Sequence, residues 1–179
     1  MVHLAWRDVE LTSGHVISTS IQDDEISRLC ELAKGSRVLE VGAAYGYSAV
    51  SMALAGAECV DSVDPHQWMR SLDTFMDNVR RLDVGSIVTP FVGESQSILS
   101  ALRDRGERYD LVFIDGDHSR QAVEEDVICA RELLNPGGVL ACHDYGEDCC
   151  CPGVRSALDA LYPPGSSFWL VGTLFGVEL

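Results

Sequence analysis

The most informative part of this 179-residue chain is Arg37-Val38-Leu39-Glu40-Val41-Gly42-Ala43-Ala44-Tyr45-Gly46-Tyr47-Ser48. It predicts a buried strand, a turn containing Gly42 and Gly46, and the start of a helix that carries Ser48. Buried strands of parallel sheets are normally runs of apolar residues, so the acidic Glu40 should have a partner. A ligand with a positive charge would supply one, whereas a phosphate would be repelled.

A glycine turn after a first strand is typical of a nucleotide site, and dinucleotide-binding proteins use the spacing G-x-G-x-x-G. Here the spacing is G-x-x-x-G, and Ala44 stands in the middle. The helix N-terminus that follows can hold a carboxylate as well as a phosphate. A ligand with an ammonium and a carboxylate, such as the methionine end of S-adenosylmethionine, would satisfy both Glu40 and the turn. A structural strand–helix turn in an unrelated α/β protein is the alternative.

Length and composition indicate one globular domain. The chain is 46% hydrophobic and 23% charged, which is ordinary for a protein with a single core. We expect residues 1–36 to form a helical cap and residues 37–179 to form a cofactor-binding core. The sequence has no run of 18 apolar residues and no basic region followed by an apolar one at its start. We therefore expect no membrane span and a cytoplasmic location.

The charge balance bears on the kind of partner. The chain has 28 acidic and 13 basic residues and a net charge of −15, which argues against nucleic acids and anionic membranes as partners. Three of the seven cysteines, Cys149-Cys150-Cys151, are consecutive. They lack the C-x₂₋₄-C spacing of a zinc site, so we expect reduced thiols in a loop.

Strand and helix patterns alternate along the chain, which predicts βαβ units. We expect an α/β fold: a doubly wound, mainly parallel, seven-stranded sheet with helices on both faces. The last two strands are joined too tightly for a crossover, so they should form an antiparallel C-terminal pair. The expected strands are 37–41, 59–63, 87–92, 109–114, 139–142, 168–173 and 174–179, and the expected helices are 23–33, 47–55, 68–82, 95–105, 119–134 and 154–161.

Polar residues follow five of these strands at the edge where such sheets bind ligands. Glu40 lies near the end of the first strand. Asp64 ends the second, where an acid can hold both hydroxyls of a ribose. The next three strands lead into Gly93-Glu94-Ser95-Gln96, Asp115-Gly116-Asp117-His118 and His143-Asp144. Each residue alone could be a turn former or a helix cap, but together they predict one site.

Two carboxylates and an imidazole come together in this prediction. Asp115, His143 and Asp144 could bind a divalent metal such as Mg²⁺, Mn²⁺, Fe²⁺ or Zn²⁺. A metal there would lower the pKa of a substrate hydroxyl and prepare a nucleophile. Alternatively, Asp115 contacts an amine of the cofactor while His143 and Asp144 only shape the pocket.

Five motifs occur in order: Val38–Ser48, Asp64, Gly93–Gln96, Phe113–His118 and Leu134–Leu140. Together they resemble the class I S-adenosylmethionine-dependent methyltransferases, from about Asp23 to Leu179. Gly46-Tyr47-Ser48 and Ser95-Gln96 resemble the catechol O-methyltransferase-like branch. The segments at 115–118 and 136–138 are most similar to its small relatives, the methyltransferase domain 24 group.

The resemblance implies roles for the matching residues. Asp64 would bind the ribose of S-adenosylmethionine, and Asp115 would contact both cofactor and metal. Metal-dependent members usually have Asp-Asp or Asp-Asn where this chain has His143 and Asp144. Some members have a catalytic lysine near the position of His118. The remaining cofactor contacts implied are Glu40, Gly42, Ala44, Gly46, Tyr47 and Ser48 at the turn and Ser95 and Gln96 at the adenine.

The implied activity is methylation of a hydroxyl of a small molecule. Because histidine titrates near neutral pH, His118 or His143 would take the proton, with a metal assisting. Two alternatives stay open: an NAD-dependent oxidoreductase and a non-catalytic S-adenosylmethionine-binding module. The chain has no large inserted lid, so a homo-oligomer could supply one. Trp6, Trp68 and Tyr145 are expected in the core, with an aromatic pocket as the alternative.

Overall fold

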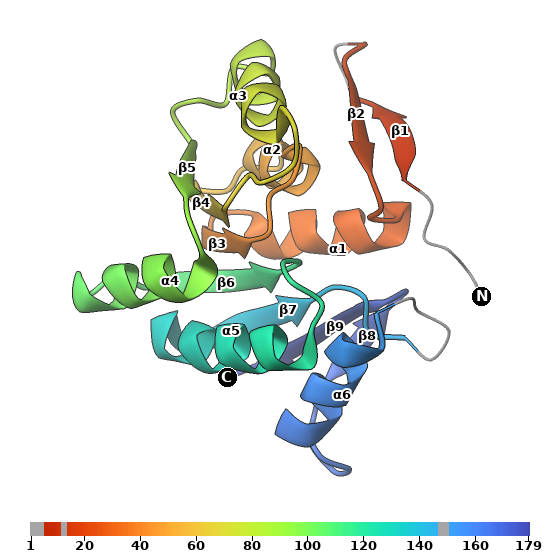
Figure 1. Cartoon of the computed structure of the whole chain (residues 1–179), viewed down its shortest axis with the longest axis vertical. Helices are drawn as coiled ribbons and strands as arrows, with labels where there is room; N and C mark the ends of the chain where they lie inside the picture. The colour runs from red at the N-terminus through yellow and green to blue at the C-terminus, as the bar shows by residue number, and fades with distance from the viewer. Residues whose placement is uncertain (1–5, 12–13, 147–150) are drawn as a thin grey trace.

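The computed structural model describes residues 6–11, 14–146 and 151–179. Its main sheet has seven strands in the order β5-β4-β3-β6-β7-β9-β8 (Figure 1). Strands β3 to β7 pair in parallel, and β9 runs antiparallel to both β7 and β8. The predicted fold class is therefore confirmed. The strands of this sheet are β3 (Arg37–Val41), β4 (Cys59–Asp64), β5 (Val88–Val92), β6 (Tyr109–Ile114), β7 (Leu134–Cys142), β8 (Trp169–Val171) and β9 (Leu174–Glu178).

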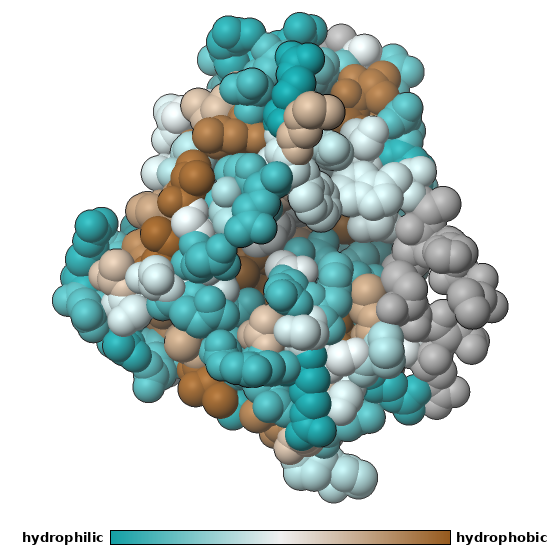
Figure 2. All heavy atoms as spheres, in the orientation of Figure 1, coloured by the Kyte–Doolittle hydropathy of each residue, from teal (hydrophilic) through white to brown (hydrophobic). Residues whose placement is uncertain are grey.

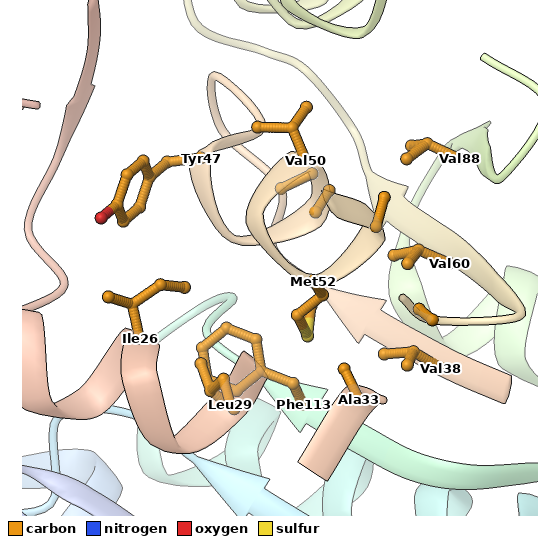
Figure 3. Close-up of a cluster of buried hydrophobic side chains, with 14 of the residues drawn as sticks. Ile26, Leu29, Ala33, Val38, Tyr47, Val50, Met52, Val60, Val88 and Phe113 are labelled. Atoms are coloured by element: carbon orange, nitrogen blue, oxygen red, sulfur yellow. The ribbon is translucent and has the colours of Figure 1, made fainter. Parts of the chain in front are cut away.

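Helices cover both faces of the sheet, because successive side chains of a strand point to opposite sides. In β3, Val38 points into one core cluster and Leu39 into the other. The first cluster, shown in part in Figure 3, is completed by α1, α2 and α3, and the second by α4, α5 and α6. The helices are α1 (Asp23–Ala33), α2 (Tyr47–Leu54), α3 (Ser71–Arg81), α4 (Ser95–Asp104), α5 (Arg120–Leu133) and α6 (Pro152–Leu161).

The prediction of a helical cap over residues 1–36 is wrong for part of that segment. An antiparallel hairpin of β1 (Arg7–Glu10) and β2 (Val16–Thr19) precedes α1. The hairpin is fixed to the start of α1 because the Arg7 guanidinium donates to the Ile21 carbonyl at 2.9 Å and to Asp23 at 2.6 Å. Residues 6–36 thus form a mixed cap of hairpin and helix.

Two other boundaries differ from the prediction by three residues or more. Helix α3 begins at Ser71 instead of residue 68, because Arg70 has a left-handed φ of 63°. Strand β7 begins at Leu134, where it pairs with Tyr109 before a register shift. Pro90 does not prevent β5 from forming, because β5 lies at the edge of the sheet. The backbone N–H that proline lacks is not needed there for a hydrogen bond to a neighbouring strand.

The surface is chiefly polar on the face shown in Figure 2, where hydrophobic residues are scattered among hydrophilic ones. None of the described helices combines the length and the apolar character that crossing a bilayer requires.

Candidate active site

A cavity of about 640 Å³ opens at the carboxyl ends of the parallel strands. The turns after β3, β4, β5 and β6 form its walls together with the end of the hairpin. The strand order reverses between β3 and β6, which is where such sheets bind ligands. Predicted site residues that line the cavity are Gly42, Ala44, Tyr47, Ser48, Asp64, Ser95, Asp115, His118 and Asp144. The others, Glu40, Gly46, Gln96 and His143, are not among its lining residues.

Close approach of two turns explains why the glycine turn has this sequence. Gly42 has a φ of 91°, and a Cβ there would lie 2.0 Å from the Asp115 carbonyl oxygen. Gly46 caps α2 with a φ of 86°, and its Cβ would lie 2.8 Å from the Phe75 ring. Gly42 therefore allows the turn after β3 to touch the turn after β6, and Gly46 lets α2 begin above Phe75.

The amides of the glycine turn point toward Asp64. Its Oδ2 accepts hydrogen bonds from the Ala43 amide at 2.9 Å and the Ala44 amide at 2.8 Å. Its Oδ1 accepts one from the His66 amide at 2.5 Å. These two amides, which precede the helix α2, are thus occupied by a side chain of the protein, and the anion expected at the N-terminus of α2 stays a prediction. Asp64 nevertheless faces the cavity, as a ribose-binding acid must.

Glu40 is fully buried beneath the cavity. Its two carboxylate oxygens accept hydrogen bonds from the hydroxyls of Ser48 and Ser62. Burial raises the pKa of Glu40 to about 7, although these hydrogen bonds lower it. The partner that a buried Glu40 was expected to need is therefore present within the protein, as two serine hydroxyls, and a cationic ligand is not required to supply it. Its contact with the cofactor stays a prediction.

The turn after β5 brings only one of its two predicted residues into the cavity. Ser95, the first residue of α4, lines the cavity, whereas Gln96 is exposed and is not among the lining residues. Glu94 lines the cavity instead and accepts a hydrogen bond from Gln67 at 3.0 Å, which links the turns after β4 and β5.

The turns after β6 and β7 bring two carboxylates and two imidazoles together. His118 Nε2 lies 2.9 Å from Asp144 Oδ2 and 3.6 Å from Asp115 Oδ1. His143 Nδ1 lies 3.4 Å from Asp115 Oδ1 and 3.5 Å from Asp144 Oδ2. The cluster expected at these two strand ends is therefore present.

A fifth residue, Glu25 of α1, completes this cluster from below, and no motif in the sequence points to it. Glu25 Oε2 lies 2.9 Å from His143 Nε2, while Oε1 accepts from the Thr173 amide at 2.6 Å and hydroxyl at 2.8 Å. Burial would raise the pKa of Glu25, but the hydrogen bond with His143 and those from the backbone of Gln22 and Thr173 lower it to about 2. Glu25 therefore remains charged and fixes the ring of His143.

The donor set suits a divalent cation. Among the residues that the structure describes, His143 Nδ1 is a buried nitrogen with no hydrogen-bond partner. Burial lowers the pKa of His143, but the carboxylates of Asp115, Asp144 and Glu25 raise it well above its usual range. A cation would therefore displace the Nδ1 proton, which faces Asp115 and Asp144, while Nε2–H donates to Glu25. Histidine ligands of metals are commonly held by a carboxylate on their other nitrogen in this way. Ligand atoms of Asp115, His143 and Asp144 all lie within 4.8 Å of one another.

The two histidines differ in access to the cavity. His143 has a fully buried side chain with carboxylates around its ring, so the prediction that it takes a proton from a substrate does not fit its position. His118 lines the cavity with a side chain 41% exposed. Its carboxylate neighbours Asp115 and Asp144 raise the pKa of His118 to about 10. His118 is therefore the candidate base by position, although it is protonated at neutral pH in this state.

Aromatic side chains gather on the hairpin side of the cavity. The ring centroid of Trp6 lies 5.6 Å from that of Tyr45 and 5.8 Å from that of Trp68. All three residues line the cavity, so the pocket alternative holds for Trp6 and Trp68. Tyr145 packs against Phe175 instead, with ring centroids 5.4 Å apart.

The cysteine run contributes one residue to the cavity. Cys151 lines it, with Sγ 3.7 Å from Asp144 Oδ2. The prediction of plain loop thiols thus misses this contact, and Cys149 and Cys150 lie outside the described residues. Asp126 of α5 also reaches the cavity and has no counterpart in the sequence motifs. Asp126 lies on the buried face of the amphipathic helix α5. The one signal in the sequence is that an acid occupies a position where the helical spacing predicts an apolar residue.

The fold is shared with solved methyltransferases. The O-methyltransferase from Bacillus cereus in complex with SAH superposes with a TM-score of 0.71 at 22% identity, covering 89% of this chain and 82% of that one. This likeness places the chain in the class I methyltransferase fold, as the sequence motifs predicted.

Family membership follows from the sequence comparison. Residues 39–145 match the methyltransferase domain family, and the chain belongs to that family. A protein of Mycobacterium sp. (strain JLS) named "Putative O-methyltransferase" is 32% identical over 142 residues, which cover 76% of this chain and 60% of that protein. A tRNA U34 carboxymethyltransferase of Psychrobacter arcticus is 34% identical over 113 residues, or 60% of this chain and 31% of that enzyme. The chain thus spans less than two thirds of the length of these relatives.

Proposed function

We propose that this protein transfers the methyl group of S-adenosylmethionine to a hydroxyl of a small molecule. Membership of the methyltransferase domain family and the cavity at the strand ends support this proposal. The SAH bound to the B. cereus O-methyltransferase, which has the same fold, supports the cofactor. The observation that carries the proposal furthest is the cluster of Asp115, His118 and Asp144, which lines the same cavity as the glycine turn and Asp64.

The cofactor would lie across the turns. Its methionine end would lie at the glycine turn near Asp115, and Asp64 would hold the ribose hydroxyls, turning away from the amides of Ala43 and Ala44. Cavity carboxylates favour a sulfonium, because it is a cation, over an anionic ligand. The same charges disfavour the phosphates of NAD, the alternative cofactor.

The reaction would be a direct displacement. The acceptor oxygen forms a bond to the methyl carbon while the carbon–sulfur bond breaks, and the electron pair of that bond stays on sulfur as the neutral thioether. The hydroxyl proton would go to His118, the imidazole within reach of the cavity. A purely cofactor-binding module would not require an imidazole at this place.

Asp115, His143 and Asp144 would hold a divalent cation such as Mg²⁺. When bound, it would supply a positive charge that lowers the pKa of the acceptor hydroxyl. Neutralisation of the charges on Asp115 and Asp144 would also lower the raised pKa of His118. The roles of His118 as base and of the three residues as ligands would then depend on each other.

A small acceptor fits this chain better than RNA. Described cavity residues include the acids Asp64, Glu94, Asp115, Asp117, Asp126 and Asp144, and no lysine or arginine. Nucleic acid binding draws its affinity from basic side chains. The tRNA-modifying relative from P. arcticus makes RNA the second candidate acceptor. A location in the cytoplasm and a homo-oligomer stay predictions.

The test combines binding with turnover. Calorimetry should detect S-adenosylhomocysteine but not NAD. Methyl transfer from labelled S-adenosylmethionine would then be followed with a panel of phenols, sugars and amines and with tRNA, in Mg²⁺ or in a chelator. We expect transfer to a hydroxyl compound in Mg²⁺ and its loss in His118→Gln. His15→Gln, outside the cavity, should retain activity. Binding of NAD alone, or transfer only to RNA, would contradict the proposal.

A further inference from the structure

Three metal-ligating side chains meet on one wall of the cavity, and one of them is a thiol. His118 Nε2 lies 2.9 Å from Asp144 Oδ2, and Cys151 Sγ lies 3.7 Å from the same oxygen. The three ligand atoms lie within 4.8 Å of one another, and all three residues line the cavity. This cluster shares Asp144 with the set of Asp115, His143 and Asp144, but it offers a sulfur as well as a nitrogen and an oxygen.

The fold brings these three side chains together from separate turns. His118 precedes α5, Asp144 follows β7, and Cys151 is the N-cap of α6. A Cβ on Gly153 would lie 2.3 Å from the His118 carbonyl oxygen, so the first turn of α6 packs directly against the backbone at His118. The C-x₂₋₄-C spacing of zinc sites describes thiolates from one segment. Here a thiol meets ligands from two other turns, so the lack of that spacing does not exclude zinc.

The donor atoms determine which cation suits the cluster. Zinc takes cysteine sulfur, histidine nitrogen and carboxylate oxygen at about 2.0–2.3 Å, so its tetrahedral ligands lie about 3.3–3.8 Å apart. The observed separations of 2.9 Å and 3.7 Å require only a small opening of the cluster to admit the ion. A thiolate favours Zn²⁺ over Mg²⁺, which prefers oxygen ligands. The acids Asp115 and Asp117 line the same cavity and add negative charge that attracts a dication.

We propose that His118, Asp144 and Cys151 form a binding site for Zn²⁺, with the fourth coordination position open to the cavity. Zinc commonly adopts a coordination of three protein ligands and one open position. On binding, the Cys151 thiol releases its proton to the solvent, because the thiolate is the ligand. The sulfur of Cys151 is then the group that distinguishes Zn²⁺ from Mg²⁺ at this wall.

The consequence for the reaction rests on the proposed function. A zinc ion would occupy His118 Nε2, the nitrogen that faces Asp115 and Asp144 in the cavity. That nitrogen would then no longer take the proton of an acceptor hydroxyl. Zn²⁺ should therefore inhibit methyl transfer, and Cys151 should make the protein sensitive to it.

The first experiment detects the sulfur ligand with Co²⁺, because a cobalt–thiolate bond gives a charge-transfer band in the near ultraviolet. We expect the band in the wild-type chain with Co²⁺ alone, and its loss when Zn²⁺ but not Mg²⁺ is added. In Cys151→Ser the band should be absent. The Kd for Zn²⁺ should rise at least about 10-fold in calorimetry, since even residues behind the ligands change metal affinity by about 10–100-fold. Cys129→Ser is the matched control: Cys129 of α5 is partly buried and is not a cavity residue, so the variant should keep the band and the Kd.

A second measurement does not depend on the folding of a variant. Alkylation of Cys151 in the wild-type protein by iodoacetamide is followed by tandem mass spectrometry, in Zn²⁺ or in Mg²⁺. We expect Zn²⁺ to suppress this alkylation, because the sulfur is then bound, and Mg²⁺ to leave it unchanged.

The third measurement is methyl transfer in saturating Mg²⁺ with increasing Zn²⁺, expressed for each protein relative to its own rate without Zn²⁺. Half-inhibition of Cys151→Ser should need a Zn²⁺ concentration at least about 10-fold higher than that of the wild-type protein. No cobalt band in the wild-type protein, a band that persists in a folded Cys151→Ser protein, or equal alkylation in Zn²⁺ and Mg²⁺ would overturn the inference and leave the proposed function intact. Failure of the wild-type protein to bind S-adenosylhomocysteine would overturn the proposed function and leave the zinc site intact.

Discussion

Ala44 holds an unfavourable backbone conformation in the glycine turn. Its φ of 44° lies in the left-handed region, which costs a residue with a Cβ about 1–2 kcal/mol. Glycine adopts this conformation readily, so Ala44→Gly should stabilise the fold by about 1 kcal/mol after its larger loss of chain entropy. For a domain of this size we expect Tm to rise by about 2–4 °C in thermal unfolding.

A second alanine provides the control. Ala55, the C-cap of α2, has an ordinary helical φ of −73°. Ala55→Gly should lower Tm, because glycine there only adds chain entropy to the unfolded state. Equal losses of Tm in both variants would show that Ala44 is not strained.

Glu40 makes stability depend on pH. Its pKa rises from an ordinary 4.5 to about 7 in the fold, so between these values the native state holds a proton that the unfolded chain has released. The contribution of Glu40 to the free energy of unfolding should therefore be fully present below pH 4.5. As pH rises to 7, the free energy of unfolding should fall by about 3 kcal/mol. In Glu40→Gln this contribution should vanish, as measured by urea unfolding between pH 5 and pH 8.

An exposed acid gives the comparison. Glu58 lies on the surface, so Glu58→Gln should keep the pH dependence of the wild-type protein. If the profiles of Glu40→Gln and wild type run parallel, Glu40 titrates normally and its burial does not raise its pKa.

Single elements were predictable where the local pattern was strong. All six helices and the seven strands of the main sheet lie where apolar periodicity placed them, within a few residues for most ends. The hairpin of β1 and β2 was missed because its strands are only four residues long and carry charges at Arg7, Asp8 and Glu10. The start of β7 was missed because Asn135-Pro136-Gly137-Gly138 indicates a loop, whereas Leu134 pairs with Tyr109.

The part of the candidate site that lies at the ends of the parallel strands could be predicted from the sequence. Asp64, Asp115 and Asp144 meet because the ends of parallel strands meet. Glu25 and Asp126 could not be placed, because both lie on helices and reach the site through tertiary packing. The serine partners of Glu40 were missed for a similar reason, since Ser62 comes from the neighbouring strand and donates across the sheet.

Helix α1 should depend on Glu25 for its attachment to the sheet. The carboxylate contacts His143 after β7 and Thr173 between β8 and β9. Removing one partner of a buried charge pair costs about 3–5 kcal/mol, so Glu25→Gln should reduce the free energy of unfolding by about that amount in urea titrations. Asp24→Asn, in the same helical turn but exposed, should change it little. Similar losses in both variants would mean that the loss of negative charge at the helix start is responsible.

The net charge of −15 should act on the molecule as a whole. Like charges repel one another more strongly in the compact state than in the unfolded chain, and salt screens this repulsion within about 10 Å at 0.1 M. Raising NaCl from 10 to 300 mM should therefore increase Tm by a few degrees, on the scale of about 1 kcal/mol. The measurement is thermal unfolding at neutral pH.

Comparison of two salts separates screening from ion binding. NaCl and KCl should give the same increase, because screening depends on ionic strength alone. A decrease of Tm with salt would mean that attractive pairs such as Arg7–Asp23 and Arg103–Glu132 outweigh the repulsion.

The contacts of Glu25 also set the order in which the protein can be built. They join residues 118 and 148 positions apart in the chain. During synthesis α1 emerges long before β7, and the turn before β9 emerges later still. Before β7 has been synthesised, Glu25 lacks its partner His143. Contacts between residues so far apart in the chain also form slowly, because a long loop must close. A ribosome-bound chain can therefore form its glycine turn early, but the half of the site that contains His143 and Asp144 matures only when Thr173 has left the exit tunnel.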